Sequence, residues 1–274
     1  MTAIIAWCTC DGKEGPASLY LASDSRITSK LSNGDVKINN DNFQKVFASP
    51  DTPDIFAFCG PIQGIGPLMN ALMKTAGEIR NERMYGEGAE NHFSEDLFQS
   101  VLRQGTLDLR SGLRVFHGYR FGTRRFGLTS MTLDVHLVPT LKIHVLKADG
   151  GILARDGSGD EMVLKRLVEY YDLEAESKGY SRWFWMSFHA SLEQCKEVTC
   201  GGPPQLAALY CQNDGYLLGV RFRDAAFVGG KPCVRDDIEY RDELLQRVDA
   251  YGKLLPGAQP HARMGRTRLF EFAP

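Results

Sequence analysis

The amino-acid sequence predicts an α+β fold, a four-layer αββα sandwich of two antiparallel sheets flanked by helix pairs. The hydrophobic pattern gives strands, two helices, strands, two helices and strands again, in that order. Strand pairs on either side of helix pairs favour a sheet-on-sheet core with helices on both outer faces. The chain has 274 residues, 43% of them hydrophobic, which is enough for one large core.

The first part of the chain supplies two strand pairs. Strands are expected at residues 3–10 and 17–23, and the segment between them is rich in turn-forming residues. A second pair is expected at 43–48 and 54–60, divided by a turn that contains two prolines. The polar stretch 33–42 lies between the pairs and is predicted to be a loop.

Two helices follow, because apolar residues recur there at helical spacing. The residues that mark them are Leu68, Met69, Leu72 and Met73 for the first helix, and Phe98, Val101 and Leu102 for the second. Ser94 is a candidate cap of the second helix. The next stretch, 111–129, interleaves arginines with aromatic residues, a composition that can bind single-stranded nucleic acid. The acidic net charge instead favours a helix-to-strand connection or a subunit contact.

The second part of the chain repeats the alternation. Strands are expected at 131–138, 141–147 and 151–155, and again at 205–211 and 216–222. The two helices between these groups have different signals. Ser158 and Glu161 have the spacing of a capping box at the start of the third helix. The fourth helix, around 180–196, carries apolar residues on one side.

The pattern divides the chain into a main domain, 1–222, and a C-terminal extension, 223–274, with no linker between them. The extension is expected to pack on the same domain or on a neighbouring subunit. It contains a predicted helical piece from Ile238 to Tyr251 and a short strand candidate at 267–272.

Composition excludes several functions. The net charge is -2, so there is no electrostatic case for binding nucleic acid or an anionic membrane. No apolar run approaches the roughly 20 residues of a membrane helix, and the first residues lack the features of a signal peptide. The seven scattered cysteines fit reduced thiols in a cytoplasmic protein. Cys8-x-Cys10 has no second Cys/His pair at zinc spacing, so neither a metal nor a cofactor is expected.

The start of the chain offers a candidate nucleophile. Methionine before a small residue is a substrate of methionine aminopeptidase, and removal of Met1 would expose Thr2. An N-terminal threonine carries a hydroxyl and an amine with a pKa near ~8, and this amine can act as general base on the hydroxyl. Threonine is common at position two, however, and taken alone these residues are better explained by an ordinary chain start.

Lys45 is the second unusual residue, because it stands in an apolar strand. A lysine is seldom buried without a partner, so Lys45 either reaches solvent from an edge or is held for a purpose. The end of the second predicted strand, Asp24-Ser25-Arg26-Ile27-Thr28, groups charged and hydroxyl side chains, and a surface loop is enough to explain this pattern.

Taken in order, these pieces resemble the proteasome β-subunit and HslV-type peptidases, members of the N-terminal nucleophile hydrolases. The resemblance covers most of residues 2–222. The motifs that carry it are Thr2 at the first strand, Asp24-Ser25-Arg26-x-Thr28, Lys45-Val46-Phe47, Phe58-Cys59-Gly60, Gly157-Ser158-Gly159 and Cys200-Gly201-Gly202.

The resemblance implies a catalytic role for each matching residue. Thr2 Oγ would attack a peptide carbonyl, and its own amine would take the proton. Lys45 would lower the pKa of nearby groups by its charge, and Asp24 would hold that lysine charged and oriented. Gly60 would offer a backbone N–H to the oxyanion, a contribution of about 3 kcal/mol. Ser158 would hydrogen-bond near the Thr2 amine.

Substrate contacts are implied in the same way. Thr28 would pair with the main chain of an extended peptide. The residues that would line the first specificity pocket are large and apolar, which predicts cleavage after apolar residues; ordinary core packing is the alternative. These residues are Ile27, Phe43, Phe47 and Phe58.

Three positions depart from the family pattern. Glu197 stands where the family usually has Asp, and Cys200 stands where it has Ser. Both are expected to take part in a rearranged network around the Thr2 amine, with Cys200 as a weaker donor. Pro61 replaces a common second glycine and removes one N–H.

The resulting hypothesis is a threonine-type endopeptidase that hydrolyses peptide substrates inside a self-associated ring after removal of Met1. Folded substrates would then require an ATP-dependent unfoldase as a partner. Two alternatives remain open. One is a catalytically silent, proteasome-like scaffold subunit, and the other is an amidase of small molecules on the same fold. Retained Met1 would favour the scaffold, and a monomeric particle would favour the amidase.

Overall fold

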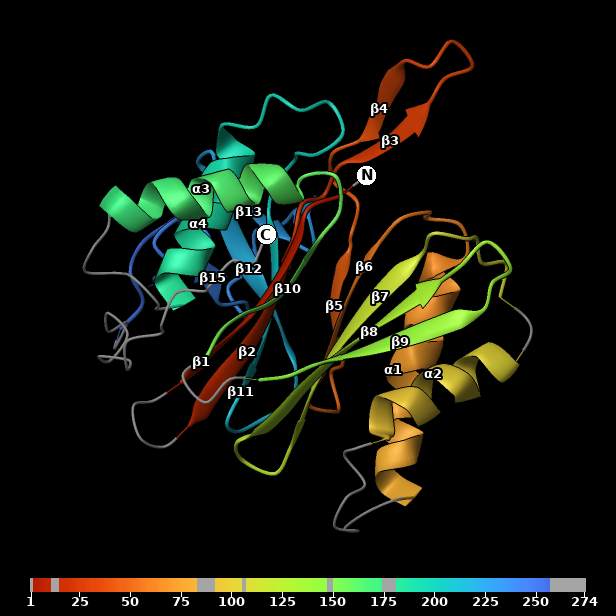
Figure 1. The fold of residues 1–274 in the computed structure, drawn as a ribbon. Helices are drawn as coiled ribbons and strands as arrows, with labels where there is room; N and C mark the ends of the chain where they lie inside the picture. Colours follow the sequence, from red (N-terminus) through yellow and green to blue (C-terminus); the bar gives the residue numbers. More distant parts are fainter. Residues whose placement is uncertain are drawn as a thin grey trace.

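The computed structural model describes residues 2–10, 15–82, 92–104, 107–146, 150–173 and 181–256. Strands dominate these residues and form three sheets, of nine, five and two strands (Figure 1). The two large sheets lie face to face, and the small one projects from one end of the molecule.

The nine-stranded sheet has the order β10-β1-β2-β11-β12-β13-β14, with β15 paired to β12 and β16 to β15. Its strands are β1 Ile4–Cys10, β2 Pro16–Ser23, β10 Gly151–Asp156, β11 Gln205–Tyr210, β12 Tyr216–Phe222, β13 Ala225–Val228, β14 Lys231–Pro232, β15 Tyr240–Arg241 and β16 Arg247–Val248. Ile4 lies opposite both Ser23 and Asp156, so β1 begins where β2 and β10 end. Gln205, the first residue of β11, also lies opposite Ser23.

The five-stranded sheet has the order β5-β6-β7-β8-β9 and is antiparallel throughout. Its strands are β5 Val46–Ala48, β6 Asp54–Cys59, β7 Arg114–Phe121, β8 Arg125–Leu133 and β9 Pro139–His144. Cys59, at the end of β6, lies opposite Arg114 at the start of β7. The two-stranded sheet is the hairpin of β3 Ile27–Lys30 and β4 Val36–Asn40 (Figure 1).

The described residues contain four helices: α1 Ile65–Glu82, α2 Phe93–Arg103, α3 Asp160–Leu173 and α4 Ser181–Glu193. Side chains of α1 and α2 share a core cluster with the five-stranded sheet, and side chains of α3 and α4 share one with β1, β2, β11 and β12. A third cluster lies between the two large sheets and includes Ile4, Leu21, Ile55 and Phe116. Alternating apolar residues on β1, β2, β6 and β11 supply both faces of these cores.

The predicted fold class, an α+β four-layer αββα sandwich of two antiparallel sheets flanked by helix pairs, is wrong. The chain is mostly β, with strands in three sheets and only four helices in its described part. The difference arises in segments that carry no alternating apolar pattern. The predicted loop at 33–42 contains β4, whose side chains are nearly all exposed, so no buried face marks it as a strand.

Three local predictions also fail. Residues 111–129 are not a connection but form most of the β7–β8 hairpin. Ser94 does not cap α2; His92 occupies the cap position and its side chain caps no backbone N–H, and Ser94 Oγ bonds His117 instead. The predicted helix from Ile238 to Tyr251 is replaced by β15, β16 and tight turns. Asp242 causes one of these turns, because its carboxylate accepts the backbone N–H groups of Leu244 and Gln246. The strand candidate at 267–272 lies outside the described residues.

None of the helices in the described part of the chain has both the length and the apolar character needed to cross a membrane. The described part of the C-terminal extension joins the large sheet, because β13 and β15 both pair with β12.

Candidate active site

Three side chains that the sequence singled out meet at one end of the nine-stranded sheet. The ammonium of Lys45 donates to Thr2 Oγ1 at 3.0 Å and to Asp24 Oδ1 at 2.8 Å. Its third acceptor is the carbonyl of Arg26, at 2.6 Å. Thr2 and Lys45 are 2% exposed and Asp24 is fully buried. The predicted juxtaposition of Thr2, Asp24 and Lys45 is therefore present in the structure.

Thr2 is held by its backbone. Gly159 N–H donates to Thr2 O at 3.2 Å, and the N–H of Ala3 donates to Asp24 Oδ1 at 3.0 Å. Gly157 packs directly on the Thr2 carbonyl, where a Cβ atom would lie 1.9 Å from the oxygen, and its φ of +93° suits glycine. The Gly157-Ser158-Gly159 segment therefore fixes the position of Thr2 through its main chain.

Asp24 is the hub of the site because its carboxylate accepts bonds from several segments. Besides Lys45 and Ala3, it accepts the N–H groups of Arg26 at 3.3 Å and Gly201 at 3.1 Å. A buried carboxylate needs such donors to offset the loss of hydration. Asp24 thus joins the start of β1, the end of β2 and the Cys200-Gly201 turn around Lys45.

Gln205 is an organising residue that the sequence analysis missed. Its side-chain oxygen accepts the N–H of Lys45 at 2.9 Å, and its amide donates to Asp24 O at 3.1 Å and to Phe43 O at 2.8 Å. Gln205 is 1% exposed and starts β11. The only sequence signal is one long polar side chain that opens an otherwise apolar strand.

Arg26, quoted in the motif but given no role, holds the corner after β2. Its guanidinium forms two bonds with the Asp41 carboxylate, at 2.6 and 3.0 Å, and these raise the pKa of Arg26. It also donates to the carbonyls of Glu197 and Cys200, both at 3.2 Å. Arg26 therefore ties the 197–200 loop to the segment that carries Asp24.

Gly60 lies just past the end of β6 with a φ of +109°. A Cβ atom there would lie 2.4 Å from Gly112 O, so no other residue fits without movement of the backbone. Cys59 before it is buried, which raises the pKa of its thiol to about 11. Phe58 N–H donates to Lys45 O at 3.1 Å, which places this end of β6 beside Lys45.

The other predicted members of the network do not join Thr2 through their side chains. Ser158 is exposed and its hydroxyl donates to Thr199 Oγ1 at 3.3 Å. Glu197 is also exposed; its carbonyl accepts a bond from Arg26, whereas its carboxylate makes no hydrogen bond in the described part of the chain. The rearranged network expected around Glu197 is thus absent here, because the loop turns this side chain toward solvent.

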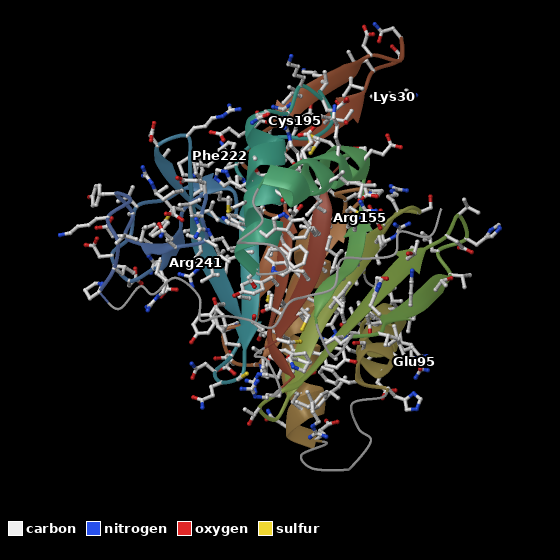
Figure 2. The ribbon with its side chains drawn as sticks, turned by 60° about the vertical axis from the view of Figure 1, so that its left-hand side comes forward. Lys30, Glu95, Arg155, Cys195, Phe222 and Arg241 are labelled. Atoms are coloured by element: carbon white, nitrogen blue, oxygen red, sulfur yellow. The ribbon has the colours of Figure 1, made fainter. Side chains whose placement is uncertain are left out.

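Cys200 is buried in the core, with its sulfur beside Gly159 and close to Ala3. Cys195 Sγ donates to Cys200 O at 3.5 Å, and the contact between these two cysteines raises the pKa of Cys200 and lowers that of Cys195 to about 7. Cys195 is half-buried and lies at the end of the molecule from which the β3–β4 hairpin projects (Figure 2). Cys200 therefore acts as a packing residue behind Thr2 and not as a donor to its side chain.

The predicted substrate-binding residues divide into two groups. Ile27 and Thr28 begin β3, and this strand pairs with β4 on one side only within the described sheets. Phe58 is 1% exposed, and Phe43 and Phe47 are half-buried; all three pack in the core cluster with α1 and α2. Phe43 meets Phe58 edge-on, with ring centroids 6.3 Å apart. These phenylalanines therefore have the core contacts that the alternative interpretation expected.

Comparison with known protein families finds none that matches the chain. Comparison with curated protein sequences likewise finds no match. The chemistry of the site is therefore inferred from its geometry. A buried cation bonded to a hydroxyl stabilises negative charge on that oxygen, which favours its use as a nucleophile. No group of His, Cys, Asp and Glu residues suited to holding a metal occurs among the described residues.

Proposed function

We propose that this chain is an N-terminal threonine peptidase of the proteasome type, in which Thr2 becomes the first residue after Met1 is removed. One observation carries the proposal: Lys45 Nζ lies 3.0 Å from Thr2 Oγ1 and 2.8 Å from Asp24 Oδ1, with all three side chains buried. The proposal depends on this arrangement of side chains and not on the overall architecture.

Acylation uses the hydroxyl and amine of one residue. Thr2 Oγ forms a bond to the peptide carbonyl carbon while its proton passes to the Thr2 amine, directly or through water. The carbonyl oxygen becomes an oxyanion, for which Gly60 N–H is the proposed donor. When the intermediate collapses, the C–N bond breaks and the leaving amine takes the proton from the Thr2 ammonium.

Deacylation repeats these steps with water as the nucleophile. The Thr2 amine takes a proton from water and the hydroxide adds to the ester carbon. The ester bond to Oγ then breaks, and Oγ takes the proton back from the Thr2 ammonium as the acid product leaves. Lys45 stays an ammonium throughout, since it donates to Asp24 and to the carbonyl of Arg26 as well as to Oγ. Its role is to stabilise negative charge on Oγ, and the role of Asp24 is to hold Lys45 in place.

Self-association is part of the proposal. Edge strand β9 and its flanks expose several large apolar side chains, which are 54–82% accessible: Val135, Val138, Ile143 and Val145. Exposed apolar residues at an unpaired sheet edge favour association with another chain. We further propose a cytoplasmic location, where the seven cysteine thiols would stay reduced, and an ATP-dependent unfoldase as the supplier of unfolded substrate.

The test is peptide hydrolysis by purified protein whose N-terminus has been sequenced. Thr2→Ala should lower kcat by at least 10³-fold, because the nucleophile is gone. Thr2→Ser keeps a hydroxyl and should retain measurable turnover. Circular dichroism and unfolding midpoints check that both variants fold.

Other results of this test would contradict the mechanism or support one of the two alternative functions. Turnover by Thr2→Ala equal to that of the wild type would overturn the mechanism. A folded wild-type protein that retains Met1 and hydrolyses nothing would favour the silent scaffold. Hydrolysis of small amides without peptides, in a monomeric particle, would favour the amidase.

A further inference from the structure

A polar cleft of about 480 Å³ lies between β8 and β9 of the five-stranded sheet and β10 of the nine-stranded sheet. Its lining includes Arg114, Lys142 and Arg155, together with one carboxylate, that of Asp156; of these residues, Arg155 is labelled in Figure 2. A volume of this size accommodates a side chain with part of its peptide. Charged side chains thus line the opening between the two sheets, whereas apolar side chains pack deeper between them.

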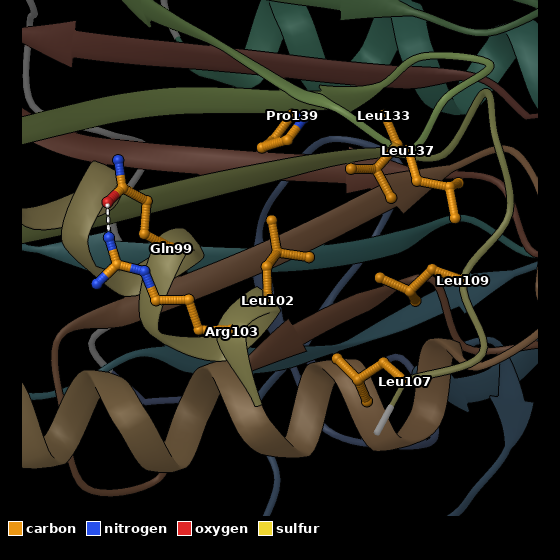
Figure 3. A pocket seen from close by; sticks show the side chains of 8 residues that line it. All are labelled: Gln99, Leu102, Arg103, Leu107, Leu109, Leu133, Leu137 and Pro139. Carbon is orange, nitrogen blue, oxygen red and sulfur yellow. Dashed lines mark hydrogen bonds between the residues drawn. The ribbon is translucent and has the colours of Figure 1, made fainter. Parts of the chain in front are cut away.

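A second cavity, of about 510 Å³, lies on the opposite face of the five-stranded sheet and gives a useful contrast (Figure 3). Five leucines and a proline dominate its lining, and its one charged side chain, Arg103, bonds Gln99 at the rim. Nothing in the structure indicates what would occupy that apolar cavity. The polar cleft, by comparison, has a defined charge.

The cations of the cleft exceed its acids. Arg114 donates to Thr132 Oγ1 at 3.0 Å and pairs with Asp156, and Arg155 lies 3.3 Å from Asp160. Lys142 is exposed and forms no ion pair in the described part of the chain. Two of the three cations thus have an acid nearby, and the charge of Lys142 remains available to a ligand.

His144 contributes polarity without charge. Its Nδ1 lies 3.1 Å from Leu153 O, which only accepts, so Nδ1 carries the proton. Its Nε2 then accepts the Ser130 hydroxyl at 2.9 Å. Burial and the charge of Lys142 both lower the pKa of His144, so the ring is neutral near pH 7. The attraction for an anion therefore comes from the lysine and the arginines.

The cleft begins beside the proposed catalytic site. Arg114 lies opposite Cys59, the residue before Gly60, and Gly60 packs on Gly112 just ahead of β7. On the other sheet, Asp156 precedes Gly157, which packs on the carbonyl of Thr2. The Arg114–Asp156 pair therefore spans the gap between the strand ends that carry Gly60 and Thr2.

We propose that this cleft is a subsite that binds the carboxylate of an aspartate or glutamate side chain on a peptide substrate. Lys142 and Arg155 would face the carboxylate, and the peptide main chain would continue toward Thr2. The inference rests on the proposed peptidase function. It also accounts for the basic cleft at the edge of the two-sheet core, in a chain whose net charge is -2.

The test separates binding from hydrolysis. Binding of dansyl-labelled hexapeptides to the full-length Thr2→Ala protein is followed by anisotropy, with glutamate or glutamine placed in turn at each position. The glutamate peptide should bind about three- to tenfold more tightly at one position, and the preference should fall with added salt. Lys142→Gln in the same background should remove it. Lys74→Gln, on the exposed face of α1, is the matched control and should preserve it.

The possible results distinguish the two proposals. A glutamate preference that Lys142→Gln removes supports the cleft even if no peptide is hydrolysed, and in that case only the peptidase proposal fails. Hydrolysis that depends on Thr2, with no glutamate preference or one that Lys142→Gln leaves intact, overturns the subsite and keeps the peptidase. Equal competition by inorganic phosphate for glutamate and glutamine peptides would also overturn it, because the cleft would then not recognise the peptide carboxylate.

Discussion

Two buried aspartates, Asp24 and Asp54, each hold a cation, yet their surroundings differ. Asp54 accepts two bonds from Arg80, at 2.7 and 2.8 Å, and one from His117 at 2.9 Å. The guanidinium of Arg80 lies over the rings of Phe93 and Phe121, so its charge faces aromatic rings. These contacts, together with the bond between Ser94 of α2 and His117, join the helices to the five-stranded sheet.

At Asp24 the cation also bonds a hydroxyl. Lys45 donates one hydrogen bond to Oγ1 of Thr2, a residue that lies just before β1. Both aspartates are fully buried, so burial and pairing alone do not distinguish a structural ion pair from a reactive one. The difference is whether the cation is directed at an atom that can react.

The largest expected effect follows from exchanging each cation for methionine. Lys45→Met should lower the peptide turnover of the wild type by at least 10³-fold, because Oγ loses its charge stabilisation. Arg80→Met should leave kcat per folded molecule within a few-fold of wild type but lower the free energy of unfolding by about 3–5 kcal/mol, because Asp54 keeps a buried charge. Turnover assays and urea unfolding of both variants measure this; equal loss of kcat in both would contradict the comparison.

The Asp54 cluster should also control acid stability. Contacts with His117 and Arg80 hold the pKa of Asp54 at about 2 despite its burial, and burial lowers the pKa of His117. His117 binds its proton in the unfolded state first, so stability should fall as the pH drops below about 6.5. A further loss of about 2 kcal/mol should follow as the pH falls from about 4 to 2, when the Asp54 carboxylate is protonated.

Urea unfolding between pH 7 and 2 measures these changes. His117→Gln should flatten the slope between pH 6.5 and 5 relative to the wild type. The same slope in both proteins would show that His117 does not carry this pH dependence.

A smaller effect concerns access to the Asp24 region. The thiol of Cys195 has a pKa lowered to about 7 by its bond with Cys200, and it is half-buried, whereas Cys59 and Cys200 are buried with raised pKa values. Iodoacetamide at pH 7.5 should therefore alkylate Cys195 before those two, at a rate that rises through pH 7. Peptide mass mapping over time measures the order of labelling, and labelling of Cys59 before Cys195 would contradict the prediction, because it would show that the Asp24 region is open to the reagent.

Parts of this picture could be predicted from residues alone. A lysine in an apolar strand is costly without a partner, which marked Lys45 as unusual, and the family resemblance then implied Asp24 as its partner. Strands such as β1, β6 and β11 were predicted because their apolar residues mark buried faces. Both inferences depend on burial, which is visible in the sequence as the composition of a segment and the spacing of its apolar residues.

The errors share one physical cause: the features that were missed depend on polar contacts, which leave no periodic pattern in the sequence. The amide of Gln205 bonds three segments, but a single glutamine at a strand start gives no sign of them. The hairpin β3–β4 and the pieces β15 and β16 are held by turns and edge pairing and not by a continuous apolar face. Strand content was therefore underestimated and the predicted fold class was wrong.

The central claim is that Thr2 is an activated nucleophile. Intact-protein mass spectrometry after treatment with an epoxyketone or β-lactone electrophile tests it most directly, since it reports chain trimming and reactivity together. The account predicts loss of Met1, one probe per chain mapped to the peptide that begins at Thr2, and no such adduct in Lys45→Met. Labelling that is unchanged in Thr2→Ala, or a protein that keeps Met1 and takes up no probe, would contradict it.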